Sequence, residues 1–258
     1  MLRCVALLFV VTAGCQGQTV AARSRFVEDG VQRSADAAWT TERIEIENAG
    51  VTAGGGLGLA ASGTDRVVAT ARLLSVADTY DKESADKSIT AVDKGFVVAT
   101  VPGVPGVTTV QCGHGIAVRS ATAEESGCDA LDVVVPSGSL DKRLTVVARS
   151  GIGKVGVALG TAVLAGLDLH ASNGSVDVSV STTQGAVVTI VSDTADIVTL
   201  RLAPDFATDS LVLEAPAVDT SAFTDVQVGK GRGAAGVGAA AITVQAGRIV
   251  LAVQPRAN

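Results

Sequence analysis

The stretch that decides the fold is residues 167–213, LDLHASNGSVDVSVSTTQGAVVTIVSDTADIVTLRLAPDFATDSLVL. Apolar and polar residues alternate there in short runs, and turn clusters such as Ser172-Asn173-Gly174 separate the runs. Alternation places successive side chains on opposite faces of a strand, and turns about ten residues apart are typical of an all-β stack. We therefore predict stacked strands with these side chains facing inward: Val176, Val178, Val180, Ile190, Leu200 and Leu202.

The composition favours a large β domain and argues against nucleic-acid binding. The chain has 258 residues, of which 47% are hydrophobic but only 3% aromatic, so its core is expected to consist of Val, Ala, Leu and Ile. The 29 glycines suit many tight turns. A net charge of −6 and the scarcity of aromatic rings oppose binding to a polyanion or stacking of bases.

The N-terminus resembles the signal of bacterial lipoproteins. Residues 1–15, MLRCVALLFVVTAGC, contain a basic start at Arg3, a short apolar core and small residues before Cys15. The resemblance implies cleavage before Cys15, lipidation of that cysteine and attachment to a membrane, and Gln16 implies sorting to the outer membrane. Thr12 departs from the usual Leu, and an ordinary signal cleaved after Ala13 is the alternative.

We expect three parts in the chain: the signal at residues 1–15, a polar tether at 16–40 and the β domain at 41–254. One short helix is expected inside the domain, since apolar residues recur at helical spacing between Asp78 and Val92, with Asp78 as a plausible N-cap.

The strand pairs and their small-residue turns, Ser172-Asn173-Gly174 and Gln184-Gly185, resemble a family of bacterial cell-envelope proteins known as "putative adhesins" of unknown function. The resemblance covers residues 43–253. It implies a single-stranded, right-handed β-solenoid that acts as a structural or adhesin-like binding module. The family offers no catalytic residues to carry over, so we expect no enzymatic activity and no cofactor. The helical insertion and a cysteine pair depart from the family pattern.

Cys112 and Cys128 are predicted to form a disulfide. Of the four cysteines, Cys4 lies in the expected signal and Cys15 is expected to carry lipid, which leaves this pair in a domain whose predicted export would permit oxidation. Two alternatives are a pair of buried, reduced cysteines and zinc bound by Cys112, His114 and Cys128, although the set of ligands expected for zinc is incomplete.

Other motifs are weaker evidence for a chemical function. Gly151–Gly156 matches the G-x-G-x-x-G of dinucleotide sites, but alternating residues follow it where a helix is required, so we interpret it as a turn between strands. His170 is expected on the outer face of its strand. A cationic tip at Lys230 and Arg232 could contact anionic envelope polymers or simply aid solubility.

Two rival functions remain at this point. A periplasmic polysaccharide-active enzyme would need converging carboxylates or basic residues in a deep groove, and acids such as Asp193 with Asp196 and Asp205 with Asp209 are only close in sequence. A small-ligand binding protein would need a closed apolar pocket. A smooth surface with scattered charge would favour the binding module, with an envelope polymer or protein as its partner.

Overall fold

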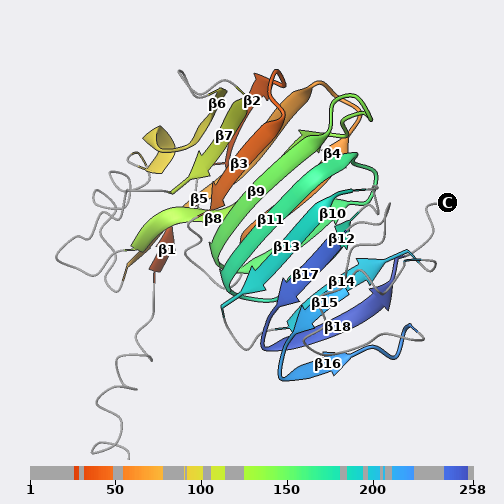
Figure 1. The fold of residues 1–258 in the computed structure, drawn as a ribbon. Helices are drawn as coiled ribbons and strands as arrows, with labels where there is room; N and C mark the ends of the chain where they lie inside the picture. The colour runs from red at the N-terminus through yellow and green to blue at the C-terminus, as the bar shows by residue number, and fades with distance from the viewer. Residues whose placement is uncertain are drawn as a thin grey trace, which may run out of the picture.

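A computed structural model describes the chain at residues 26–28, 32–48, 55–77, 90, 92–100, 106–113, 125–180, 185–193, 197–203, 206, 211–223 and 241–254. These residues form strands throughout most of their length (Figure 1). The strands are β1 (Phe26–Glu28), β2 (Gln32–Ala38), β3 (Arg43–Asn48), β4 (Gly56–Ser62), β5 (Arg66–Ala77), β6 (Val97–Thr100), β7 (Val107–Cys112), β8 (Glu125–Pro136), β9 (Leu144–Ile152), β10 (Lys154–Leu159), β11 (Leu164–Asn173), β12 (Val176–Val180), β13 (Val187–Ser192), β14 (Ile197–Leu202), β15 (Leu211–Glu214), β16 (Ala217–Asp219), β17 (Ala241–Gln245) and β18 (Arg248–Val253).

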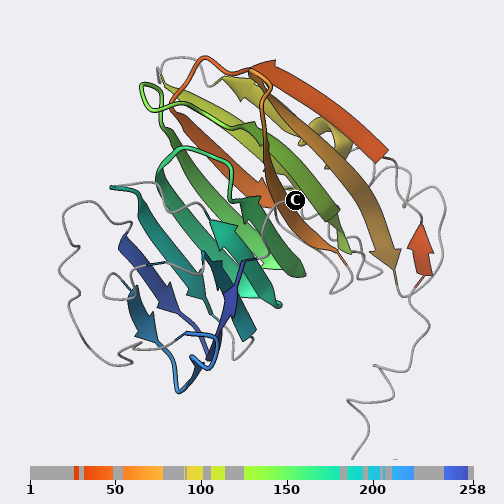
Figure 2. The same ribbon diagram turned by 90° about the vertical axis from the view of Figure 1, so that its right-hand side faces the viewer.

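The strands belong to two sheets that share one core. Sheet 1 has the order β1-β5-β8-β4-β10-β12-β14-β18-β16, with β2 also paired to β5, and sheet 2 has the order β15-β17-β13-β11-β9-β3-β7-β6. From β9 to β14 the chain alternates between the sheets, so each turn of the chain adds one strand to each sheet. Strands of successive turns pair in parallel and in register, as β10 does with β12. The stack runs from the N-terminal strands to the blue C-terminal strands (Figures 1 and 2).

The all-β prediction is confirmed, whereas the single-stranded solenoid is replaced by two mixed sheets. Antiparallel pairs occur at the N-terminal end, where β5 pairs with β8 and β6 pairs with β7. Spatial order also departs from chain order, because β3 lies between β7 and β9, and β17 lies between β13 and β15. Local alternation defines strands and their faces but does not specify which strand lies beside which.

The core consists of the inward side of each alternating run. The six residues predicted to face inward are at most 1% exposed, which confirms that prediction. The hydrophobic cluster joins both sheets, with Leu169 from sheet 2 and Val178 from sheet 1 among its members. Small branched side chains fill the space between the sheets, so the core needs few aromatic residues.

The folded unit begins earlier than predicted, because β1 and β2 lie inside the segment expected to be a tether. Both strands pair antiparallel with β5. β2 has the sequence QRSADAA and exposes every second residue, so its hydrophobic signal is weak. Polar contacts help to hold it: Arg66 of β5 donates a hydrogen bond to Asp36, and this bond and the positive charge lower the pKa of Asp36.

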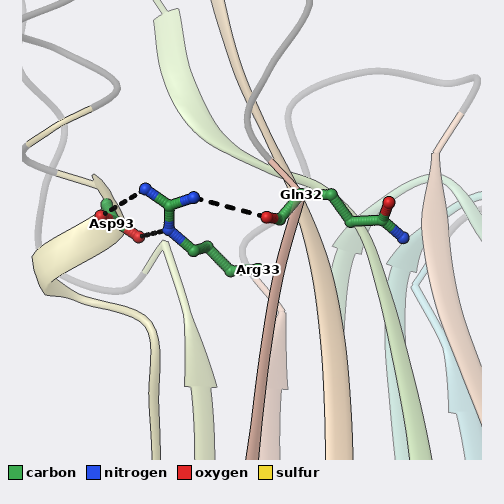
Figure 3. A network of polar contacts seen from close by, with 3 residues as sticks. All are labelled: Gln32, Arg33 and Asp93. Carbon is green, nitrogen blue, oxygen red and sulfur yellow. Dashed lines mark hydrogen bonds and ion pairs between the residues drawn. The ribbon is translucent and has the colours of Figure 1, made fainter.

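A second polar contact connects the two sheets at this end of the stack (Figure 3). The Arg33 guanidinium of β2 donates to both carboxylate oxygens of Asp93, with Nε–Oδ1 2.6 Å and Nη2–Oδ2 3.1 Å. Asp93 lies just before β6, the edge strand of sheet 2. The ion pair therefore spans the edges of both sheets, and Arg33 also donates to the carbonyl of Gln32.

The predicted helix falls almost wholly outside the described residues. Thr90 and Val92–Lys94 are helical, and the Gly95 amide donates to the Val92 carbonyl at 2.9 Å. Among the described residues, no helix has the length and apolar character needed to cross a membrane.

Cys112 and Cys128 are joined in a disulfide, in agreement with the sequence prediction. Cys112 ends β7 in sheet 2 and Cys128 lies in β8 of sheet 1, and both are fully buried. The bond therefore connects the two sheets through the core and does more than close the surface segment between the cysteines.

We expect Val178→Asp to destabilise the domain by several kcal/mol, because it places an unpaired charge among aliphatic side chains. Ser179→Asp, one residue along on the outer face, is the matched control and should leave stability nearly unchanged. Urea denaturation followed by circular dichroism measures both. Equal midpoints for the Val178 variant and the parent would contradict the inward assignment.

The free energy of unfolding should be about 3 kcal/mol lower for the double variant Cys112→Ala/Cys128→Ala than for the parent. A disulfide that closes a loop of this length restricts the unfolded chain, and the entropy that the unfolded chain loses corresponds to about that free energy. Denaturation with and without reductant provides the control. Reductant should destabilise the parent and leave the double variant unchanged. Equal stability of the parent and the double variant without reductant would be inconsistent with a stabilising cross-link.

Candidate functional site

The outer faces of the two sheets differ over their central strands. Sheet 2 presents polar and charged side chains at its outward positions: Glu45, Glu47, Arg149, Asp168, His170 and Glu214. Sheet 1 presents mostly small residues over its central strands, including Gly58, Ala60, Gly156 and Ala158. A face of small side chains lets another surface approach the backbone closely, so we take the outer face of sheet 1 as the candidate site.

A shallow groove of about 490 Å³ lies on this face. Gly58 of β4 and Gly156 of β10 are paired in register and form its floor. Asp132 of β8 is registered with Gly58 on one side, and Asp177 of β12 is registered with Gly156 on the other. The groove is therefore two strands wide and follows the strand direction.

The two floor glycines have different surroundings. A Cβ on Gly58 would lie 2.2 Å from Oδ1 of Asp132, so the Asp132 carboxylate leans across that glycine. A Cβ on Gly156 would meet nothing within 4 Å, so the floor is open there. The absence of a side chain at Gly58 thus lets the Asp132 carboxylate lie low over the floor of the groove.

One wall of the groove carries a compensated charge and the other does not. Arg201 donates to both oxygens of Asp177, with Nε–Oδ1 and Nη2–Oδ2 distances of 2.7 Å, and the hydrogen bond and the negative charge of Asp177 raise the pKa of Arg201. The Asp132 side chain has neither hydrogen bond nor ion pair with the described residues, and the same holds for the side chain of Lys154 at the outward start of β10. Two uncompensated charges of opposite sign therefore lie on the same face.

The two carboxylates of the groove lie far apart. Three strand spacings separate Asp132 from Asp177, which places their Cα atoms about 14 Å apart. Arg201 donates to both oxygens of Asp177. The groove is shallow and mostly apolar, and its chemistry suits the contact of one surface with another.

The other sequence candidates do not converge on this groove. Gly151–Gly156 spans the connection from β9 to β10, in which Gly153 has φ +121°. The element that follows Gly153 is the strand β10, so the predicted turn between strands is confirmed. His170 lies on the outer face of sheet 2 with its Nε2 2.8 Å from Oδ1 of Asp193. The described residues contain no group of three His, Cys, Asp or Glu side chains that could hold a metal, and the disulfide removes Cys112 and Cys128 as thiolate ligands.

Several predicted residues lie outside the described part of the chain: Cys15, His114, Asp196, Asp205, Asp209, Lys230 and Arg232. The sequence analysis also did not predict that Asp132 and Lys154 lie at this site, or that Gly58 forms part of the groove floor. Apolar and polar residues alternate clearly in the sequences of their strands, but only the register between β8, β4 and β10 brings these residues together.

Comparison with known proteins gives one informative match. No protein-family model matches the sequence, and no curated protein matches it. The fold is similar to a solved structure from Clostridium sporogenes described as a "putative cell adhesion protein", with a TM-score of 0.52 and 12% identity over 87% of this chain and 100% of that one. At this identity the likeness concerns the fold alone.

Substitutions at two nearby glycines test the geometry of the groove floor. Gly153→Ala should cost about 1–3 kcal/mol, because the residue has positive φ and its Cβ would lie 2.5 Å from the Gly55 carbonyl oxygen. Gly156→Ala should leave stability equal or slightly higher, since its Cβ enters open space and alanine restricts the unfolded chain. Thermal unfolding measures both variants, and a large loss in Gly156→Ala would mean that the floor is not open.

Proposed function

We propose that the protein is an exported, lipid-anchored component of the cell envelope that acts as an adhesin-like binding module without enzymatic activity. The observation that carries the proposal is the fold, which is similar to that of a "putative cell adhesion protein" over 87% of this chain and 100% of that one. An adhesin-like neighbour points to the envelope or cell surface as the place of action.

The surface of the domain supports binding over catalysis. Its groove on sheet 1 is shallow, its lining is mainly apolar, and the Asp177 wall is neutralised by Arg201. A polysaccharide-active enzyme on such a scaffold needs converging uncompensated carboxylates, whereas a binding module needs an accessible face of suitable shape.

The N-terminal sequence supports the anchor. A short apolar segment precedes Cys15, and ten residues separate that cysteine from Phe26 at the start of β1. Lipid on Cys15 would therefore hold the domain close to the membrane, and Gln16 favours the outer membrane in the manner of lipoproteins. The partner proposed for the domain is an envelope polymer or protein.

Cys15→Ser should abolish metabolic labelling with palmitate and shift the protein from the membrane fraction to the soluble fraction, or leave the precursor uncleaved. Cys4→Ser is the matched control, because Cys4 lies in the segment that is removed and should be dispensable. Labelling and fractionation of cells expressing each full chain give the answer. Equal labelling of the Cys15 variant and the parent would refute the anchor.

The absence of enzymatic activity is tested with purified protein and isolated envelope polysaccharides, with new reducing ends and unsaturated sugars as readouts. We expect neither. Release of either product that disappears in Asp132→Asn would overturn the proposal in favour of an enzyme.

A further inference from the structure

We infer that the outer face of sheet 1 is a self-association surface, whose occupant is the same face of a second copy of this chain. The inference deepens the proposed function and rests on it, since it names the partner of the binding face. It is carried by the placement of Asp132 and Lys154 around the glycine-rich segment of β4.

Asp132 and Lys154 lie on opposite sides of β4. Asp132 of β8 is registered with Gly58, and Lys154 of β10 is registered with Gly56. They are therefore two strands apart and offset by two residues, which places their Cα atoms about 12 Å from each other. Both are exposed, and neither has a charged partner among the described residues. The two charges thus remain available to another molecule.

A twofold axis lying in the interface between two copies can exchange these charges. If it passes over the midpoint between Asp132 and Lys154 and is perpendicular to the line that joins them, each copy places its carboxylate opposite the other copy's ammonium group. Two reciprocal ion pairs result, as in any isologous contact. This midpoint lies over Gly56 and Gly58, which have no Cβ atoms to keep the sheet 1 faces of the two copies apart.

The rest of the face is compatible with close packing. Around the two charges lie Val134, Ala60 and Ala158, all short and apolar. From β5 to β16 the sheet spans seven strand spacings, about 34 Å, and five residues along each strand cover about 16 Å. The contact would bury roughly 500 Å² on each copy, which is at the low end for specific interfaces and suits reversible association.

The charge balance favours a second copy over a charged polymer. The Asp177–Arg201 pair is internally neutral, so the groove region carries one uncompensated negative and one uncompensated positive charge. A polyanion or polycation would meet attraction at one position and repulsion at the other. A surface with the same two charges, related by a twofold axis, satisfies both.

Charge reversal provides the first test, with the full chain purified in detergent and analysed by sedimentation over a range of concentrations. The parent should dimerise reversibly. Asp132→Lys and Lys154→Glu should each weaken dimerisation about tenfold or more, because like charges then face each other. The combined variant Asp132→Lys/Lys154→Glu should restore it. A parent that stays monomeric, or a combined variant that is as weak as either single one, would overturn the inference.

Cross-linking provides the second test, in cells and without purification. In Asp132→Cys/Lys154→Cys, a disulfide within one copy is excluded because the Cα atoms are about 12 Å apart, beyond the roughly 7 Å limit. Oxidation should therefore give a covalent dimer on non-reducing gels. The matched control is Glu45→Cys/Asp168→Cys on the outer face of sheet 2, two strands apart, which should stay monomeric. Equal dimer yields from the two variants would count against a specific face.

These outcomes separate the inference from the proposed function. If the protein is labelled with palmitate and lies in the envelope but fails both tests, the anchored binding module remains and its partner is a different molecule. If labelling fails while dimerisation and cross-linking succeed, the self-association surface remains and the envelope location is wrong.

Discussion

The structure depends on one packing constraint, the filling of the space between two sheets by a single row of aliphatic side chains from each strand. Every parallel strand contributes inward residues at alternate positions, and in-register pairing stacks like upon like, as with Val176 on Val198 and Val178 on Leu200. Each fully buried side chain of this size contributes about 1.5–3 kcal/mol of transfer free energy. Because register is coupled to face, a slip of one residue would expose a whole row, so the core itself fixes the pairing.

The N-terminal end of the stack needs further contacts, because edge strands there have no neighbour on their outer side. The antiparallel strands β5 and β6 end the runs of parallel pairing. The Arg33–Asp93 ion pair then joins the two edges, and the Cys112–Cys128 disulfide joins β7 to β8 within the core one step further in. The ion pair is exposed in part and contributes modestly, whereas the disulfide acts on the unfolded chain and gives the greater stabilisation.

Many features of the fold could be predicted from the sequence. The others could not, and the reasons are physical. Alternation is a local property, so it revealed the strands, the inward residues from Val176 to Leu202 and the all-β class. The cysteine pair followed from the count of four cysteines and from the predicted export of the domain. The order of strands could not be predicted, since β3 is separated in space from its chain neighbours by long-range pairing with β7 and β9. β2 was missed because a strand held by hydrogen bonds and the Asp36–Arg66 pair has almost no hydrophobic pattern.

The candidate site was hidden for the same reason that the strand order was. Asp132, Gly58 and Lys154 are unremarkable in sequence, and each occupies an outward position where either a polar or a small residue is tolerated. Only the neighbouring positions of β8, β4 and β10 place a free carboxylate and a free ammonium group around a glycine floor. The two sheets share one core and have equal need of inward aliphatic residues, so packing does not require that their outer faces differ. Solvation alone would be served by longer polar side chains at every outward position, in place of the glycines and alanines of β4 and β10. The central strands of sheet 1 combine small outward residues with the charges of Asp132 and Lys154, and this combination is the physical basis for the proposal that this side of the molecule contacts another surface.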